Sequence, residues 1–186
     1  MRFPLEVVRE VRRVIAAHAH RPFLLGYRFS PEEPGAGALR TADALTLVDR
    51  LIEEGQIDYL HASLYNLLEG KPQDYVGNQT TAEQIIECVA GRLPLIAAGE
   101  VRTPREARAA LAMGLPLVAV GRSLVINPGW VELAQTGQEE RIDTVLDLSR
   151  LPSDLTVPDK LWGVIEATPG WFPVLRHEEI RDEAAV

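Results

Sequence analysis

The chain has 186 residues, of which 46% are hydrophobic and 25% are charged, enough apolar material for one globular domain or for part of a larger one. The net charge of −8 argues against nucleic acid as the main partner. The single cysteine, Cys88, excludes an internal disulfide and fits a reducing compartment. Its apolar helical surroundings favour a buried thiol over a nucleophile.

Residues 4–17 read as an amphipathic helix with an apolar stripe along one side. The stripe consists of Leu5, Val8, Val11 and Ile15. Acidic residues interrupt this segment, which is unlike a signal peptide, and no apolar run in the chain approaches the roughly 20 residues that span a membrane. We therefore expect a cytoplasmic protein. His18 and His20 have no carboxylate or cysteine clustered near them, so we expect solvated histidines at a helix end rather than metal ligands.

The first predicted strand covers residues 23–27 and leads through Arg28 into a loop rich in proline and glycine. Arg28 stands where the strands of a barrel present functional side chains. From its position alone, Arg28 is either the partner of a salt bridge or a donor to an anionic ligand.

The next helix is predicted to be capped by Thr41 and closed by Gly55, and a second strand follows at residues 57–60. His61 and Ser63 then lie at the carboxyl end of this strand. His61 is either a general acid or ligand-facing donor, or a buried histidine bonded to the backbone. Residues 64–79 read as a long irregular loop of the kind that covers the mouth of a barrel.

Thr80 and Glu83 form a capping box for a helix over residues 81–92. The apolar run at residues 95–98 is typical of a strand that is buried on both faces. This predicted strand ends at Gly99.

Three agreeing signals open the next helix: Thr103 at the N-cap, Pro104 at the first helical position and Glu106 in a capping box. Gly114 is suited to end it. A second buried strand is predicted at residues 117–120, before Gly121 and Arg122.

Two parallel strands joined by a helix place their glycine turns, at Gly99 and Gly121, side by side at the carboxyl ends of the strands. The guanidinium of Arg122 offers a fork of donors that suits a phosphate. In a (β/α)8 barrel, the loops after the seventh and eighth strands are the usual phosphate site. The alternative is that both glycines only turn the chain and that Arg122 is a surface charge.

Asn127 and Pro128 are predicted to open a short helix that Gly137 ends, and the composition changes from about residue 138. Residues 150–175 are rich in proline and tryptophan, with one helical piece near 159–167. We therefore predict a domain over residues 1–137 and a tail over 138–186 that wraps its surface and frays at the end. The aromatic residues of this tail read as packing anchors; they are Trp162, Trp171 and Phe172.

Alternation of four strands with helices predicts a parallel α/β sheet. A closed barrel needs eight strands and typically about 250 residues. The chain is therefore either an open doubly wound sheet or the second half of a barrel. No G-x-G-x-x-G follows the first strand, which disfavours the open sheet as a nucleotide-binding fold.

Five motifs occur in a specific order and spacing: RFPLEVVREVR, GYRFSPEE, IDYLHASL, PLIAAGEVRTPREARAALAMG and LVAVGRSLVINPGWV. Through them, residues 2–135 resemble the C-terminal half of the old yellow enzyme family, the FMN-dependent NAD(P)H:flavin oxidoreductases. The resemblance implies a (β/α)8 TIM barrel of which this chain forms strands five to eight, followed by an irregular C-terminal tail.

The resemblance also implies FMN as the cofactor, bound at the carboxyl face of the barrel. Arg28 would lie against the pyrimidine edge of the flavin, and Ser63 and His61 near the flavin or the mouth. The backbone around Gly99-Glu100 and Gly121-Arg122, with the Arg122 guanidinium, would hold the FMN phosphate.

The reaction of the family implies NAD(P)H as hydride donor and an activated C=C bond of an enone-type substrate as acceptor. The family's His-His or His-Asn pair, which binds the substrate carbonyl, and its active-site tyrosine lie upstream of the matched region, so we assign no catalytic residue here. We assign no metal ligand either. We expect a partner for the exposed sheet edges, either the missing N-terminal half-barrel or a second copy. The alternatives are a non-catalytic half-barrel that binds phosphate or a partner, and a four-unit α/β enzyme for a small phosphorylated substrate.

Overall fold

The computed structural model describes residues 1–73 and 75–175. The chain divides into two compact units, one made of Met1–Val101 and Glu106–Ala119, the other of Arg102–Arg105 and Val120–Val186. The predicted fraying of residues 176–186 lies outside the described residues. The boundary at residue 137 stays a prediction.

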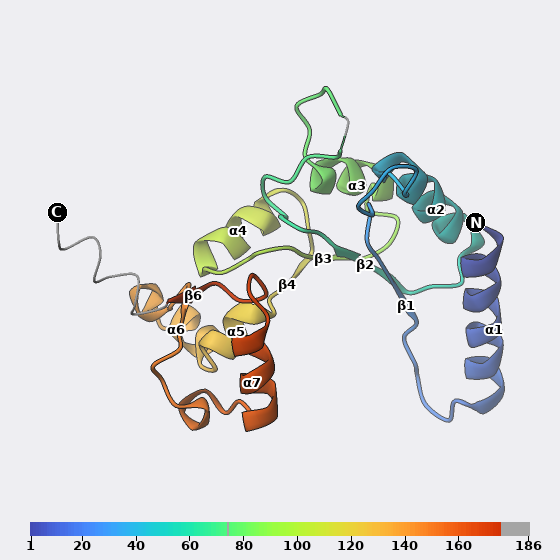
Figure 1. Ribbon diagram of the computed structural model, residues 1–186. Helices are drawn as coiled ribbons and strands as arrows, with labels where there is room; N and C mark the ends of the chain where they lie inside the picture. The colour runs from blue at the N-terminus through green and yellow to red at the C-terminus, as the bar shows by residue number, and fades with distance from the viewer. Residues whose placement is uncertain (74, 176–186) are drawn as a thin grey trace. The chain divides into compact units, whose positions relative to one another are not determined.

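The first unit alternates helices and strands, and its four strands form one parallel sheet in the order β1-β2-β3-β4 (Figure 1). The strands are β1 (Gly26–Phe29), β2 (Tyr59–Ser63), β3 (Leu95–Ala98) and β4 (Leu117–Ala119). The helices are α1 (Arg2–His18), α2 (Thr41–Glu54), α3 (Thr81–Val89) and α4 (Pro104–Ala112). The predicted parallel α/β architecture is confirmed.

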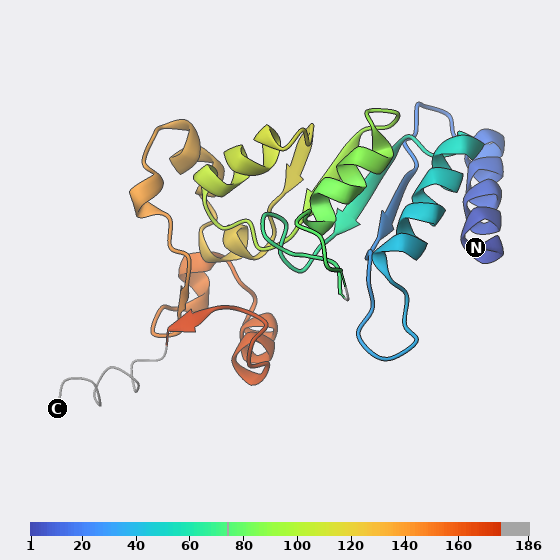
Figure 2. The same cartoon turned by 90° about the horizontal axis from the view of Figure 1, so that it is seen from above.

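The helices cover only one face of this sheet. Figure 1 shows α2 and α3 on the same side, and Figure 2 shows how helices and strands alternate along the unit. Most residues of the covered face are buried, namely Phe29, Leu60, Ala62, Leu95 and Ala97. The opposite face, which we call the open face, carries Arg28, His61, Ser63, Ile96 and Leu117, most of them paired in register.

The prediction that residues 117–120 form a fully buried strand is wrong: Leu117 is exposed, and residues 118–120 are only half-buried. Leu117 pairs with Ile96 on the open face and is 51% exposed. An apolar run is the pattern of a strand covered on both sides, and here one side carries no helix from the described residues of the first unit. Phe23 and Leu24, predicted as strand residues, precede β1 and are exposed, because pairing with β2 begins only at Gly26.

The structure confirms some of the predicted helix caps and corrects others. Thr80 caps α3 as predicted: its hydroxyl accepts the N–H of Glu83 at 3.2 Å, and the Glu83 carboxylate accepts the N–H of Thr80 at 2.7 Å. Gly55 ends α2 with φ of 62°. Thr41 is not the predicted N-cap, because α2 is capped at Arg40 and the Thr41 hydroxyl donates to Glu32 instead.

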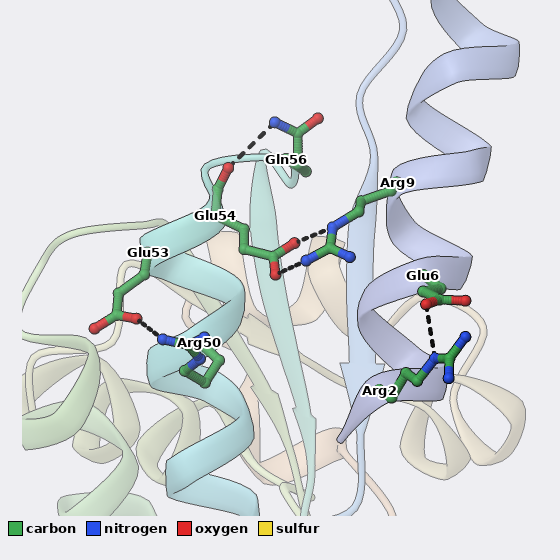
Figure 3. Close-up of polar contacts among 7 residues, drawn as sticks. All are labelled: Arg2, Glu6, Arg9, Arg50, Glu53, Glu54 and Gln56. Carbon is green, nitrogen blue, oxygen red and sulfur yellow. Dashed lines mark hydrogen bonds and ion pairs between the residues drawn. The ribbon is translucent and has the colours of Figure 1, made fainter.

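Polar contacts fasten α1 to the neighbouring segments. Arg9 pairs with Glu54 at the end of α2 (Figure 3). Arg12 donates to the backbone carbonyl of Gln56 at 2.7 Å and to Asp58 at 2.8 Å. The same Asp58 oxygen accepts the backbone N–H of Leu25 at 2.6 Å. Asp58 therefore joins α1 to the segments that enter β1 and β2.

The second unit has its own small core. Its elements are α5 (Arg122–Ile126), α6 (Trp130–Gln135), η1 (Glu139–Arg141), β5 (Leu146–Asp147), η2 (Pro152–Leu155), α7 (Asp159–Ala167) and β6 (Val174–Leu175). β5 and β6 pair in parallel. The predicted helix near 159–167 is confirmed, and a further short helix, α5, begins directly after the predicted glycine turn at Gly121. None of the helices in the described ranges is long and apolar enough to cross a bilayer.

Asn127 was predicted to cap the helix that becomes α6, and this is wrong. Gly129 is the N-cap residue of α6. The Asn127 side chain is buried, donates to the Asp143 carbonyl at 2.8 Å and accepts the Asp143 N–H at 2.9 Å. The side chain also donates to the Ser123 carbonyl of α5 at 3.2 Å. It thus satisfies backbone groups of α5 and of Asp143, 16 residues downstream, rather than the N–H groups that begin α6.

Replacing Asp58 with Asn tests how much its contacts to Arg12 and Leu25 contribute to stability. The Leu25 N–H and the Arg12 guanidinium lower the pKa of Asp58 below its ordinary value of 3.8. The carboxylate therefore contributes stability above pH 3.8 that is lost as the pH falls through the lower folded-state value. We expect Asp58→Asn to lower the free energy of unfolding by about 1 kcal/mol near neutral pH, with the difference fading in acid.

The measurement is urea unfolding across a pH series. Glu53→Gln is the control, because Glu53 forms an exposed pair with Arg50 within α2. An Asp58→Asn variant whose stability ran parallel to that of the wild type down to pH 2 would contradict the prediction.

Candidate functional site

Arg28 and Ser63 lie side by side on the open face. The Arg28 guanidinium donates to the Ser63 hydroxyl at 3.0 Å. Both residues lie inside β1 and β2 rather than just after them, because β2 runs on to Ser63 through its pairing with Ala98. The structure thus brings together two of the predicted site residues near the carboxyl ends of neighbouring strands. An exposed guanidinium there is available to an anionic or electron-rich ligand.

His61 is the register partner of Arg28 on the same face. Its side chain is half-buried, and burial together with the charge of Arg28 lowers its pKa below 6.5. Nε2 of His61 is buried and has no hydrogen-bond partner among the described residues. At Nε2, the alternative of a histidine bonded to the backbone is therefore not observed among the described residues. A neutral imidazole with an unsatisfied ring nitrogen is suited to a ligand that supplies the missing bond.

Glu32 ties together the two loops that follow β1 and β2. One of its oxygens accepts the Thr41 hydroxyl at 2.9 Å, and both accept the backbone N–H of Gln73 at 3.0 Å. Sequence reasoning did not single out Glu32, since a glutamate in a proline- and glycine-rich loop looks like a solvated residue. No local pattern indicates a partner 41 residues away.

A pocket of about 480 Å³ opens between these two loops. Pro31 and Glu32 line it from the loop after β1. Ser63, Tyr65 and Lys71 line it from β2 and the loop that follows. Ser63 therefore connects the open face to a cavity large enough for part of a cofactor or substrate.

Gly99 and Glu100 form a tight turn directly after β3. The Gly99 carbonyl accepts the N–H of Leu67 at 3.0 Å, and a Cβ on Gly99 would lie only 2.7 Å from that nitrogen. Glu100 adopts φ of 53°, a left-handed conformation that is uncommon outside glycine. A glycine is therefore needed at position 99 because the backbone of the loop after β2 approaches it closely.

Gly121 and Arg122 belong to the second unit, where Gly121 is the N-cap residue of α5. Its φ is −116°, and nothing lies within 4 Å of where a Cβ would be. The Arg122 guanidinium donates to the backbone carbonyl of Trp171 at 2.8 Å. A joint phosphate site of this turn with Gly99-Glu100 stays a prediction.

The remaining candidates from the sequence lie elsewhere. His18 and His20 are exposed at the end of α1. Cys88 is half-buried in α3 next to the Leu45 carbonyl, and burial raises the pKa of its thiol. A raised pKa disfavours the reactive thiolate.

The two glycine turns are expected to respond differently to alanine. Gly99→Ala would press a methyl group against the Leu67 backbone and should lower the free energy of unfolding by about 1–3 kcal/mol. Gly121→Ala places its methyl in open space at a φ that alanine tolerates, so it should change stability little. Denaturant unfolding of both variants gives the comparison; equal losses would contradict the cramped geometry at Gly99.

Comparison with known proteins covers most of the chain. The model of the NADH:flavin oxidoreductase / NADH oxidase family matches residues 1–141. A probable NADH-dependent flavin oxidoreductase of Bacillus subtilis, YqiG, is 36% identical over 171 residues, which are 92% of this chain and 45% of that protein.

Two longer relatives also match. An NADH:acrylate oxidoreductase of Vibrio harveyi is 27% identical over 97% of this chain, and an NADH:fumarate oxidoreductase of Klebsiella pneumoniae is 29% identical over 89% of it. In each, the match covers 18% of the relative. The chain thus spans less than half the length of the curated relatives it matches. By the extent of the family match and its likeness to the Bacillus protein, the chain belongs to the NADH:flavin oxidoreductase / NADH oxidase family, whose cofactor is FMN.

Proposed function

We propose that this chain provides the phosphate-side and pyrimidine-side contacts for FMN in an NADH-dependent oxidoreductase. The observation that carries the proposal is the Arg28–Ser63 pair on the open face of a parallel sheet, within the region that matches the family. FMN, when bound, accepts hydride from NADH and passes it to an acceptor.

The sheet itself supports a barrel origin for this site. Its strands follow one another in sequence order, and the covered face carries all of the buried strand residues. A doubly wound sheet would reverse its strand order and carry helices on both faces. We therefore propose that β1 to β4 are strands five to eight of a (β/α)8 barrel, with the open face lining its interior.

The residues on the open face fit a flavin in their chemistry. Arg28 supplies a fixed positive charge, which stabilises negative charge as it develops on a reduced ring system. Ser63 holds the Arg28 guanidinium in place at 3.0 Å. His61 offers a buried ring nitrogen that lacks a partner among the described residues.

The phosphate would be held further along the sheet. β3 and β4 pair at Ala98 and Ala119, so their carboxyl ends are neighbours. Gly99-Glu100 follows the first of these ends, and Gly121-Arg122 follows the second by two residues. We propose that backbone N–H groups of these turns and the Arg122 guanidinium bind the phosphate.

The proposed electron acceptor is an activated C=C bond. Two relatives are named for acrylate and fumarate, acids in which a C=C bond is conjugated to a carboxylate. Their names and that of the Bacillus relative specify NADH as the donor. No described residue of this chain is assigned to proton transfer, and we propose that the remainder of a complete enzyme supplies it.

The open face and the segment before β1 expose apolar side chains that another protein surface could bury. Leu117 is 51% exposed on it, and Phe23 and Leu24 before β1 are exposed as well. Apolar surface of this kind favours association. We propose that the other half of the barrel, or a second copy of the chain, packs against it.

Titration with FMN and with riboflavin tests the proposal. FMN should bind with quenching of flavin fluorescence, and Arg122→Ala should weaken FMN binding by about tenfold or more because a charge-assisted bond to phosphate is lost. Riboflavin has no phosphate and should be affected little. Arg141→Ala is the control, since Arg141 is an exposed arginine of the same unit. An absence of FMN binding, or equal effects of the two variants, would contradict the proposal.

A second measurement needs no ligand. Because the charge of Arg28 contributes to the lowered pKa of His61, Arg28→Gln should raise that pKa toward 6.5. Burial remains, so the recovery should be partial. An NMR titration of the His61 imidazole follows this, with the exposed His18 as internal control. An unchanged His61 titration would show that the Arg28 charge does not act on the open face as proposed.

A further inference from the structure

Arg122 is held by a residue far along the chain. Its Nη1 donates to the backbone carbonyl of Trp171 at 2.8 Å, across 49 residues of sequence. Trp171 lies between α7 and β6, in the tail of the chain. One donor of the guanidinium is thereby fixed by an acceptor whose position depends on the folding of the tail.

The same tail packs against the other end of α5. Ile126, the last residue of this helix, is 2% exposed and belongs to the core cluster of the second unit. The other members of the cluster come from the tail: Leu146, Leu155, Val157, Trp162, Ile165 and Phe172. Asn127 adds two hydrogen bonds to the backbone of Asp143. A helix of five residues is too short to be stable alone, so these contacts determine where α5 lies.

Phe172 anchors the segment that carries the Trp171 carbonyl. Its side chain is buried in the cluster, while the neighbouring Trp171 is 40% exposed. The two rings meet edge to face with centroids 5.1 Å apart. A bridge between Pro169 and Phe172 and a bond from the Trp171 N–H to the Thr168 carbonyl complete the turn.

We propose that the turn formed by residues 168–172 is a positioning element for Arg122 and thereby determines how strongly FMN is held through its phosphate. This inference rests on the proposed function. An arginine side chain loses considerable rotamer freedom when it binds a ligand, and one that is already held loses less. The turn touches neither flavin nor phosphate in this proposal; it acts only through the guanidinium and the position of α5.

The test compares FMN with riboflavin in the full chain. Phe172→Ala removes the anchor and should weaken FMN binding by roughly threefold to tenfold, the range expected when one long side chain is no longer preorganised. Riboflavin binding should stay unchanged. Leu51→Ala is the matched control: Leu51 is 1% exposed in α2, so this variant creates a core cavity in the other unit and should leave the ratio of the two affinities as in the wild type.

A double variant shows whether the effect passes through Arg122. In an Arg122→Ala background, Phe172→Ala should cause no further loss of FMN affinity, because the group that the turn positions is already absent. Additive losses would overturn the inference. Hydrogen exchange of the α5 amides gives a ligand-free readout: Phe172→Ala should increase exchange over residues 122–126 and leave α2 and α3 protected. The milder Phe172→Leu is used if the alanine variant does not fold.

The outcomes separate the two proposals. If the wild type binds FMN and Phe172→Ala weakens FMN and riboflavin equally, or neither, the turn does not act through Arg122 and only this inference is overturned. If the wild type binds no FMN, the proposed function is contradicted, and this inference with it.

Discussion

The parallel pairing of β2 with both β1 and β3 is the constraint on which the site depends. It fixes the register in which Arg28 stands opposite His61 and in which Ser63 stands opposite Ala98. Because side chains alternate along a strand, this register directs Phe29 and Leu60 toward the helices, and Arg28, His61 and Ser63 toward the open face. A shift by one residue would bury Arg28 beneath the helices and remove the group that the proposed cofactor site needs.

The energetics of the two faces differ accordingly. On the covered face, buried leucine and alanine side chains contribute through the removal of apolar surface from water. On the open face, Arg28 donates a hydrogen bond across the strands to Ser63, and Nε2 of His61 is unsatisfied among the described residues. A face with this composition contributes little to folding and is available for a ligand or a partner.

Much of this architecture could be predicted from the sequence, where the deciding signal is local. The capping box at Thr80, the left-handed glycine at Gly55 and the proline that opens α4 act within one helical turn. Errors arose where a distant group competes. The Thr41 hydroxyl bonds to Glu32, the Asn127 amide bonds to Asp143, and the start of β1 is set by its pairing partner. The local sequence at those positions does not indicate these distant partners.

The proposed site shows the same limit. Position and family resemblance indicate Arg28, Ser63 and the glycine turns as candidates, but they do not indicate the residues that hold these candidates in place. Glu32 binds a backbone N–H 41 residues away, and Arg122 binds a backbone carbonyl, which any residue type could supply. A contact to a backbone group does not require a particular residue type. The groups that hold a site in place are therefore harder to predict from the sequence than the side chains that form it.

The sequence separation of these contacts has a consequence for how the protein is made. Every strand of the first unit pairs with the strand that precedes or follows it, so the sheet can grow unit by unit as the chain leaves the ribosome. The bond from Arg122 to Trp171 spans 49 residues and cannot form until α7 and the turn after it have been synthesised. The scaffold can therefore fold during translation, whereas the environment of Arg122 is completed among the last steps.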